Sequence, residues 1–415
     1  MKTRLALMLS VVLLGLFLAS SQLPGAEPTA PFQLTASDSA HWYRGNLHTH
    51  SLWSDGDDYL ESIAKWYTDH DYHFLSFTDH NVLADRERWS TISENKGGEK
   101  AFAKLQQNFP DWIETREEEG KQQVRLRTFE EVSKRFNRTG EFLLIQGEEI
   151  SDKFEKLPIH LNGTNVAERL TPRAGDSVLE VIQNNVNALQ IQRQQTGQAM
   201  MIHLNHPNFG YAITADDLAR VVGENFFEVY NGHPGVHNAG DDSHPSTERI
   251  WDLVLTQRLA ELDLPLMYGL ATDDGHNYHN IPSRGSEPGR GWVMVLAENL
   301  TAESLINSLE QGRFYSSSGV ELAEVKHNKT SYTVRIEPKP MTRYKIEFIG
   351  TRHNSTPEDL GIVLETFYGN SATYEYQGDE LYVRARITAS TPHPNPSELH
   401  DHEMAWTQPV VVKGK

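Results

Sequence analysis

The chain has 415 residues, of which 38 are lysine or arginine and 57 are aspartate or glutamate, so its formal net charge is −19. Such a surface repels polyanions, and the sequence contains no basic stripe that would contact phosphates. We therefore expect a small-molecule substrate and no nucleic-acid partner. The chain has no cysteine, so neither disulfides nor thiol nucleophiles contribute.

Residues 1–26 have the pattern of a secretory signal peptide. Lys2 and Arg4 precede an apolar run over residues 5–19, and small residues follow it. Cleavage is expected after Ser21 or Ala26. We predict a secreted or periplasmic protein with no stable membrane anchor after cleavage. An uncleaved anchor is the alternative, because the run is only a few residues short of spanning length.

Short apolar runs then alternate with amphipathic segments. Residues 46–50 have the pattern of a strand end, residues 59–67 have helical spacing, and residues 73–77 form the next strand candidate. Further strands are predicted at residues 142–146, 199–203, 226–230 and 266–271. Serial strand–helix units predict an α/β fold whose parallel strands close into a barrel over residues 41–318.

Two regions depart from this alternation. Residues 85–139 are long, highly charged and mainly helical in pattern, which predicts an insertion over one end of the barrel. Beyond residue 319 the pattern changes to alternating strands, so we predict a small β-rich accessory region over residues 319–415. Its strand candidates are residues 332–336, 344–349, 362–367 and 380–387.

The first functional motif is His48-Thr-His50, which follows the first strand candidate. Side chains alternate along a strand, so both imidazoles lie on one face and can reach one metal ion. An H-x-H pair alone is weak evidence, and two surface histidines are the simpler interpretation. Four residues later begins Ser54-Asp55-Gly56, where a turn at the glycine can direct the Asp55 carboxylate back toward the histidines.

Four later apolar runs also end in histidines or carboxylates. His80 follows the second strand candidate, and Glu148-Glu149 with His160 follow the third. The remaining runs lead to Asn205-His206-Pro207-Asn208 and to Asp273-Asp274-Gly275-His276. The ends of barrel strands gather at one face, so together these residues predict a metal site there. Imidazole and carboxylate without thiolate favour zinc, manganese or iron.

The strings HTHSLWSDG, FTDHN, GEEIS with IHLNG, NHPN and TDDGH resemble the successive motifs of the PHP (polymerase and histidinol phosphatase) superfamily over roughly residues 41–295. The stretch GNLHTHSLWSDGDD, continuing to FTDHNVL, is similar to the exported carbaryl-hydrolase (CehA/McbA-type) branch. The resemblance implies a distorted (β/α)7 barrel with a centre of two to three divalent metal ions.

Carried over motif by motif, the resemblance implies three ligand sets. They are His48, His50, Glu149 and Asp274 for the first metal, Glu149, His160 and His206 for the second, and Asp55, His80 and His276 for the third. Glu148, Asp273 and His203 are the neighbouring alternatives, although the spacing of the motifs favours Glu149, Asp274 and His206.

This chemistry predicts hydrolysis by a metal-activated water, with no protein nucleophile. His203, His233 and His279 are candidates for a general acid, although each has a structural role as its simpler interpretation. We predict that Arg284, Arg290 and His233 bind substrate, because guanidinium groups match phosphate oxygens. For both arginines, a solvated loop position is an equally good interpretation.

Three functions remain. A phosphoesterase acting on small phosphomonoesters or phosphodiesters is first. A carbamate, carboxylic ester or amide hydrolase is second, and a metal-dependent binding protein without catalysis is third. Because all nine ligand positions hold a competent residue, we rank the binding protein last.

Overall fold

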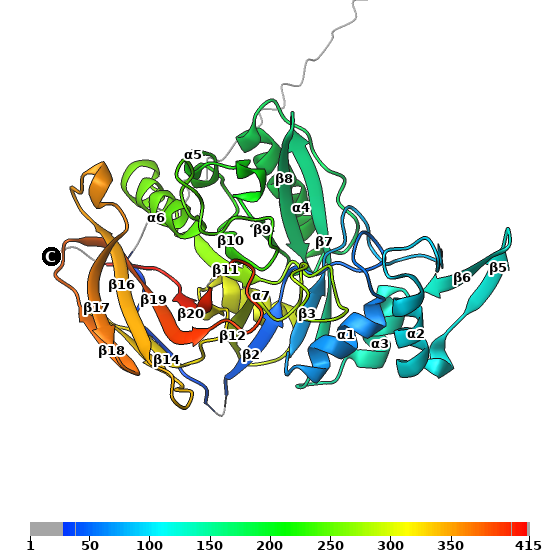
Figure 1. Ribbon diagram of the computed structural model, residues 1–415. Helices are drawn as coiled ribbons and strands as arrows, with labels where there is room; N and C mark the ends of the chain where they lie inside the picture. The colour runs from blue at the N-terminus through cyan, green and yellow to red at the C-terminus, as the bar shows by residue number, and fades with distance from the viewer. Residues whose placement is uncertain (1–27, 38, 400, 413–415) are drawn as a thin grey trace, which may run out of the picture.

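The computed structural model describes residues 28–37, 39–399 and 401–412, and it has a mixed α/β fold built around one 14-stranded sheet (Figure 1). In spatial order the strands are β11 (Tyr268–Thr272), β10 (Phe226–Asn231), β9 (Met201–Leu204), β8 (Leu157–Thr164), β7 (Leu143–Phe154), β3 (Phe74–Phe77), β2 (His41–Asn46), β12 (Trp292–Ala297), β13 (Phe314–Ser317), β20 (His402–Thr407), β19 (Glu380–Pro392), β16 (Tyr344–Arg352) and β17 (Ile362–Tyr368), with β21 (Val410–Val411) beside β19.

Helices connect several of these strands. Helix α1 (Leu60–Asp69) joins β2 to β3, which pair in parallel, so the predicted strand–helix–strand unit is confirmed. Helix α4 (Val178–Thr196) leads from β8 to β9, and α6 (Thr247–Gln257) leads from β10 to β11. Two shorter helices are α5 (Ala215–Ala219) and α7 (Ala302–Glu310). Each predicted strand of this part is present within a few residues of its expected bounds.

The closed barrel of parallel strands is not confirmed. Within the described ranges the hydrogen-bonded path begins at β11 and has no backbone ladder from β11 to β12. The expected parallel order is wrong at two places, because β8 and β12 run antiparallel to their neighbours. Only Glu155 and Lys156 separate β7 from β8, and a turn of that length makes a hairpin, whereas a parallel pair needs a long crossover.

The strands enclose a packed interior. Phe74 is fully buried beside Met201, Leu270 and Val293. Its ring lies flat against β2, where a Cβ atom on Gly45 would come 2.2 Å from Phe74 Cζ. This close approach requires glycine and brings β2 and β3 together directly beneath the ends that carry the predicted ligands.

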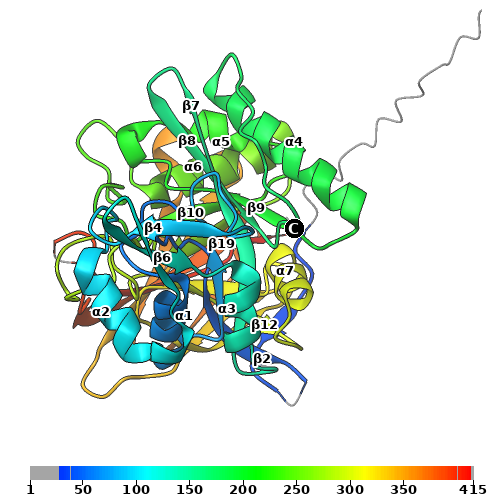
Figure 2. The same cartoon turned by 90° about the vertical axis from the view of Figure 1, so that its right-hand side faces the viewer.

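The insertion at residues 85–139 contains a small sheet in addition to helices. It contains α2 (Gly98–Asn108), α3 (Phe129–Phe136) and a three-stranded sheet of β4 (Arg88–Thr91), β6 (Lys121–Leu126) and β5 (Thr115–Glu118). Figure 2 shows it in front of the main sheet. Val124 and Leu126 are buried at alternate positions, a period-two signal that the surrounding charges obscured in the sequence.

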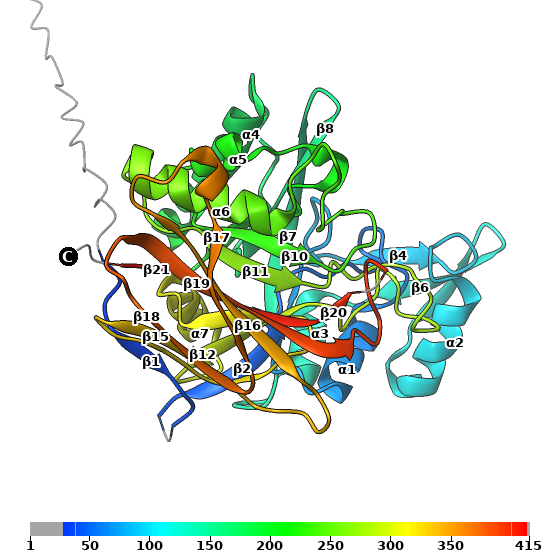
Figure 3. The same ribbon diagram turned by 60° about the vertical axis from the view of Figure 1, so that its left-hand side comes forward.

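The C-terminal region is β-rich, as predicted (Figure 3). A second sheet contains β1 (Phe32–Leu34), β14 (Leu322–His327), β15 (Ser331–Ile336) and β18 (Ser371–Glu375). It packs on the main sheet through a shared core that includes Tyr332, Phe348 and Val383. A separate domain beginning at residue 319 stays a prediction, because the main sheet continues from β13 through β20 to β19 without interruption.

The predicted signal peptide lies outside the described residues. Over the part of the chain that is described, no helix combines the length and hydropathy needed to cross a membrane.

Candidate metal centre

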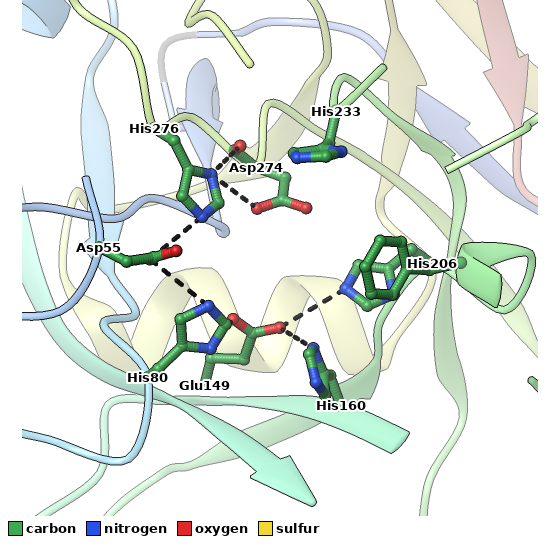
Figure 4. Close-up of a pocket in the computed structure, with 9 residues that line it drawn as sticks. Asp55, His80, Glu149, His160, His206, His233, Asp274 and His276 are labelled. Carbon is green, nitrogen blue, oxygen red and sulfur yellow. Dashed lines mark hydrogen bonds and ion pairs between the residues drawn. The ribbon is translucent and has the colours of Figure 1, made fainter. Parts of the chain in front are cut away.

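The nine predicted ligands lie together at one end of the parallel strands. They come from the ends of β2, β3, β9 and β11, from within the hairpin strands β7 and β8, and from the turn that holds Asp55. Most of them line one cavity (Figure 4). Two isolated bridges, Thr49 with Gly275 and His80 with Glu149, hold the strand ends in register where the ligands leave the sheet.

The first group is a buried set of four side chains. His50 Nε2 lies 3.2 Å from both Glu149 Oε2 and Asp274 Oδ1. His48 Nε2 lies 3.5 Å from Glu149 Oε2 and 3.3 Å from Asp274 Oδ1. Two imidazole nitrogens and two carboxylate oxygens therefore face a common point.

The second group surrounds Asp55. Its Oδ1 lies 3.2 Å from His276 Nε2 and 3.5 Å from His80 Nε2. His50 Nδ1 is 3.7 Å from the same oxygen, so His50 stands between the first two groups. Asp55 and His80 are partly exposed, so this group opens toward solvent.

The third group shares Glu149. Its Oε1 lies 3.0 Å from His160 Nδ1 and 3.5 Å from His206 Nε2. His80 Nδ1 is 2.8 Å from the other oxygen, Oε2. Glu149 therefore connects the first group to the third, in the way expected of a bridging carboxylate.

The donor atoms fit divalent cations by their chemistry and by their lack of other partners. In the described chain, six buried ligand atoms accept or donate no hydrogen bond: His48 Nε2, both ring nitrogens of His50, Glu149 Oε2, His160 Nδ1 and Asp274 Oδ1. An unpartnered buried polar atom is unfavourable, and each of these six atoms lies within 3.7 Å of an atom of another proposed ligand. These imidazole and carboxylate atoms would hold divalent cations, which would supply the partners that the atoms lack.

Mutual attraction between opposite charges shapes the electrostatics of the cluster. Burial raises the pKa of Glu149, but the charges of His80, His48 and His160 outweigh burial and hold this pKa well below its usual range. For His48, burial lowers the pKa, yet Asp274, Glu228 and Glu149 raise it well above the ordinary value. The carboxylates therefore remain negative and demand positive charge, which protons or metal ions can supply.

Glu228, on β10, was not identified from the sequence. It forms hydrogen bonds with two of the proposed ligands, His48 and His206, on the side away from the first group. Its Oε1 accepts hydrogen bonds from His48 Nδ1 at 2.7 Å and from Thr272 Oγ1 at 2.7 Å. Its Oε2 accepts from the backbone N–H of His206 and from Asn231 Nδ2, both at 2.8 Å. With the His48 proton held on Nδ1, the lone pair of Nε2 faces the first group.

Other neighbours orient the ligands in the same way. His276 Nδ1 donates to the Asp274 carbonyl at 2.9 Å, which leaves Nε2 free toward Asp55. Asn205 Nδ2 donates to Glu149 Oε1 at 2.8 Å. Asp274 itself has φ of +49°, an uncommon conformation for a residue with a side chain, and it turns the carboxylate inward after β11.

The neighbouring alternatives face elsewhere. Glu148 accepts from the Leu170 N–H at 2.7 Å and lies on the opposite side of β7 from Glu149. Asp273 accepts from the N–H groups of Arg290 and Gly291 at 2.7 and 2.9 Å. His203 is fully buried 3.6 Å from Glu228, behind the cluster.

A cavity of about 130 Å³ opens onto the cluster. Besides ligands, it is lined by Phe209 and by His233, which is labelled in Figure 4. His233 Nδ1 accepts the Gly235 N–H at 3.0 Å, so a neutral ring carries its proton on Nε2. Burial lowers the pKa of His233, which favours this neutral form.

A lysine from the insertion reaches the rim of the cluster. Lys96 Nζ lies 3.3 Å from Asp55 Oδ2, and its side chain is 59% exposed. The sequence did not identify it, because tertiary packing decides which side chain of the insertion reaches the site.

The structure corrects the substrate-binding prediction for Arg290. The side chain is buried and donates to Gly232 O at 2.7 Å, to Asn395 O at 3.1 Å and to Glu287 Oε2 at 3.2 Å, so it holds loops together and does not line the cavity. Arg284 lines a neighbouring groove instead of the cavity. His279 lies 3.1 Å from Asp57 O, which corresponds to the structural role considered for it.

No protein-family model matches the sequence, and no curated protein matches it. Similar solved structures include a two-domain protein from Bacteroides vulgatus that contains a predicted PHP-like metal-dependent phosphoesterase. Its sequence identity is 14%, the match covers 93% of this chain and 100% of that chain, and the TM-score is 0.41. An amidohydrolase from Chromobacterium violaceum has 13% identity, coverage of 57% and 88%, and a TM-score of 0.29. Likenesses at these TM-scores do not establish a family for this chain.

Proposed function

We propose that this chain is a metal-dependent hydrolase of the PHP type whose nine clustered side chains bind two to three divalent cations. The observation that carries the proposal is the convergence of unpartnered, buried imidazole and carboxylate atoms at the edge of a cavity. Zinc, manganese and iron fit this donor set. When bound, such ions supply an activated water and stabilise negative charge on substrate oxygens.

The residues around the cavity have separate roles in this proposal. Glu228 fixes the orientation of His48, and Asn205 fixes that of Glu149. His233 donates from Nε2 to a substrate oxygen, because its Nδ1 is already occupied by the Gly235 N–H. Phe209 excludes water from one wall of the cavity.

For the substrate we propose small phosphomonoesters or phosphodiesters. Lys96 supports this choice, because a cation at the rim of the metal cluster adds attraction for an anionic substrate. Its partner Asp55 is also a proposed ligand, so Asp55 would share its charge with a metal ion when one is bound, and the Lys96 ammonium group would be more available to substrate.

A second candidate is a carbamate, carboxylic ester or amide hydrolase. The observation in its favour is that the described residues lining the cavity include no arginine or lysine. A neutral substrate needs no such partner. The two candidates therefore differ in whether Lys96 contributes to substrate binding.

A substrate panel with metal analysis tests the proposal. Purified protein should contain two to three equivalents of metal and hydrolyse 4-nitrophenyl phosphate or bis(4-nitrophenyl) phosphate, while His50→Ala and Asp274→Ala should be inactive. Activity confined to 4-nitrophenyl acetate or aryl carbamates would favour the second candidate. Full metal loading without activity on either class would instead indicate a binding protein.

Lys96→Ala separates the two hydrolases, and Lys100→Ala is the matched control. Both lysines are exposed on the insertion, but Lys100 has no ion pair with a ligand within the described chain. For a phosphoesterase, Lys96→Ala should lower kcat/KM for phosphates by roughly tenfold, as expected for loss of a charge-assisted contact of about 1.4 kcal/mol. An equal effect on neutral esters would contradict this role.

We also propose that the protein is exported, on the strength of residues 1–26 alone. Expression of the full chain and N-terminal sequencing of the product test this directly. A mature N-terminus at residue 22 or 27 is expected, and retention of Met1 in the mature protein would contradict export by cleavage.

A further inference from the structure

The cavity at the metal cluster is small. At about 130 Å³ it has room for the reacting group of a substrate and little more, and most of its wall consists of proposed ligands. Small-molecule sites usually enclose several hundred Å³. The rest of a substrate must therefore extend into a neighbouring space.

A groove of about 460 Å³ is lined by Pro234, the residue that follows His233 in the chain. His233 lines the cavity and Pro234 lines the groove, so the two spaces share a wall at this peptide. The groove has five apolar residues along it: Pro234, Pro282, Pro394, Pro396 and Leu399. Leu399 is 77% exposed, so its side chain is available to an apolar ligand in the groove.

The groove is built from three loops that are tied together. Arg290 donates to Gly232 O, next to His233, and also to Asn395 O and Asn395 Oδ1 on the loop between β19 and β20. The Tyr230 and Ser397 hydroxyls are 3.1 Å apart, which adds a second tie to that loop. Four proline rings restrict the backbone, so the groove is formed before a ligand arrives.

Arg284 lines the groove and carries a positive charge there. In the described parts of the chain its guanidinium group has no hydrogen bond or ion pair, and the residue is exposed. A guanidinium plane packs against flat apolar groups as well as against anions. At the rim of the groove, Arg284 can therefore contact the apolar group of an anionic substrate as well as its negative charge.

From these observations we propose that the groove binds a bulky apolar group of the substrate, while the reacting bond lies in the cavity. The proposal rests on the hydrolase function and assigns a role to the C-terminal region, whose loop at residues 393–399 supplies one wall. A Leu399 side chain covered by ligand is removed from water, which favours binding.

The kinetic test compares phenyl phosphate with 4-tert-butylphenyl phosphate, because the tert-butyl group adds apolar bulk and changes the acidity of the leaving phenol little. Leu399→Asp should raise KM for the tert-butyl substrate by roughly tenfold. KM for phenyl phosphate and kcat for both substrates should change less than twofold. Met341→Asp is the control, because Met341 is fully exposed in the same C-terminal region and lies outside the groove.

A binding test makes the result independent of catalysis. Calorimetric titration of chelator-treated protein with 4-tert-butylphenol should show binding that Leu399→Asp weakens and that Met341→Asp and His50→Ala leave unchanged. Equal binding by wild type and Leu399→Asp, or no binding by wild type, would overturn the groove proposal. If the phenol binds as expected and no phosphate ester is hydrolysed, the groove stands and the phosphoesterase proposal fails.

Discussion

Replacing Glu228 with glutamine tests the metal centre without touching a proposed ligand. Glu228 accepts four hydrogen bonds, including one from His48 Nδ1 at 2.7 Å and one from the His206 N–H at 2.8 Å. Glutamine keeps the shape but has one oxygen, so its amide nitrogen must face two of the four donors. Either His48 loses its acceptor or the His206 backbone does.

We expect Glu228→Gln to weaken binding at the first metal position. Loss of a hydrogen-bonded partner behind a ligating histidine typically reduces metal affinity by about 10–100-fold, or roughly 1.4–2.7 kcal/mol. The unpaired donors should also lower the free energy of unfolding of the metal-free protein by about 1–3 kcal/mol. Competition with a fluorescent chelator measures the first quantity and urea unfolding in the presence of excess chelator measures the second.

Glu148→Gln is the matched control. Glu148 is also buried on the sheet, directly before the ligand Glu149, but it faces the Leu170 N–H and not the cluster. Burial raises the pKa of Glu148 to about 7, so glutamine resembles its protonated form. Metal affinity should remain within twofold of wild type. Equal metal affinity in wild type and Glu228→Gln would refute the role assigned to Glu228.

Three further outcomes follow from the structure. Removal of metal with a chelator should lower Tm, because a ligand present at 100 times its Kd stabilises the native state by about 2.7 kcal/mol. An unchanged Tm in scanning calorimetry would argue against a metal centre. Burial raises the pKa of Glu61 from 4.5 to about 7, so the folded protein binds more protons than the unfolded chain between these values and loses stability as pH rises through them. Glu61→Gln should therefore stabilise the protein by up to about 3 kcal/mol at pH 8 and little below pH 4.5, and urea midpoints independent of pH would contradict this. Arg384 on β19 donates to both carboxylate oxygens of Asp252 on α6 at 2.8 Å. Arg384→Ala should therefore leave the buried Asp252 charge unpaired and lower the free energy of unfolding by about 3–5 kcal/mol. A change below 1 kcal/mol in urea unfolding would show that this ion pair does not hold α6 to β19.

Local sequence patterns predicted most strands of the parallel part and the β-rich character of the C-terminal region. The unit at residues 46–77 formed as expected, because its apolar spacing changes from strand to helix period within a short stretch. The hairpin of β7 and β8 was missed, since the strand at residues 143–154 alternates apolar and polar residues only in part. The insertion was predicted as mainly helical because its many charges hid the alternation on β6.

Within the site, the ligand candidates were recognisable because each follows an apolar run, and strand ends meet at one edge of a sheet. Glu228 carried a weaker signal, a single charge inside the apolar run FFEVY, which is typical of a buried partner. Arg290 was misplaced because a loop arginine has the same sequence pattern whether it is solvated or buried. Lys96 and the groove at Leu399 had no local signal.

The sequence by itself determined which side chains are available for metal binding and approximately where each strand ends, because both depend on residue type and short-range periodicity. Only the tertiary structure decided how those side chains share a centre, with Glu149 between two groups and Glu228 behind His48. It also decided that a C-terminal loop reaches the cavity. These contacts join residues far apart in the chain, and they are set by packing and by hydrogen bonding of buried groups, which no local pattern encodes.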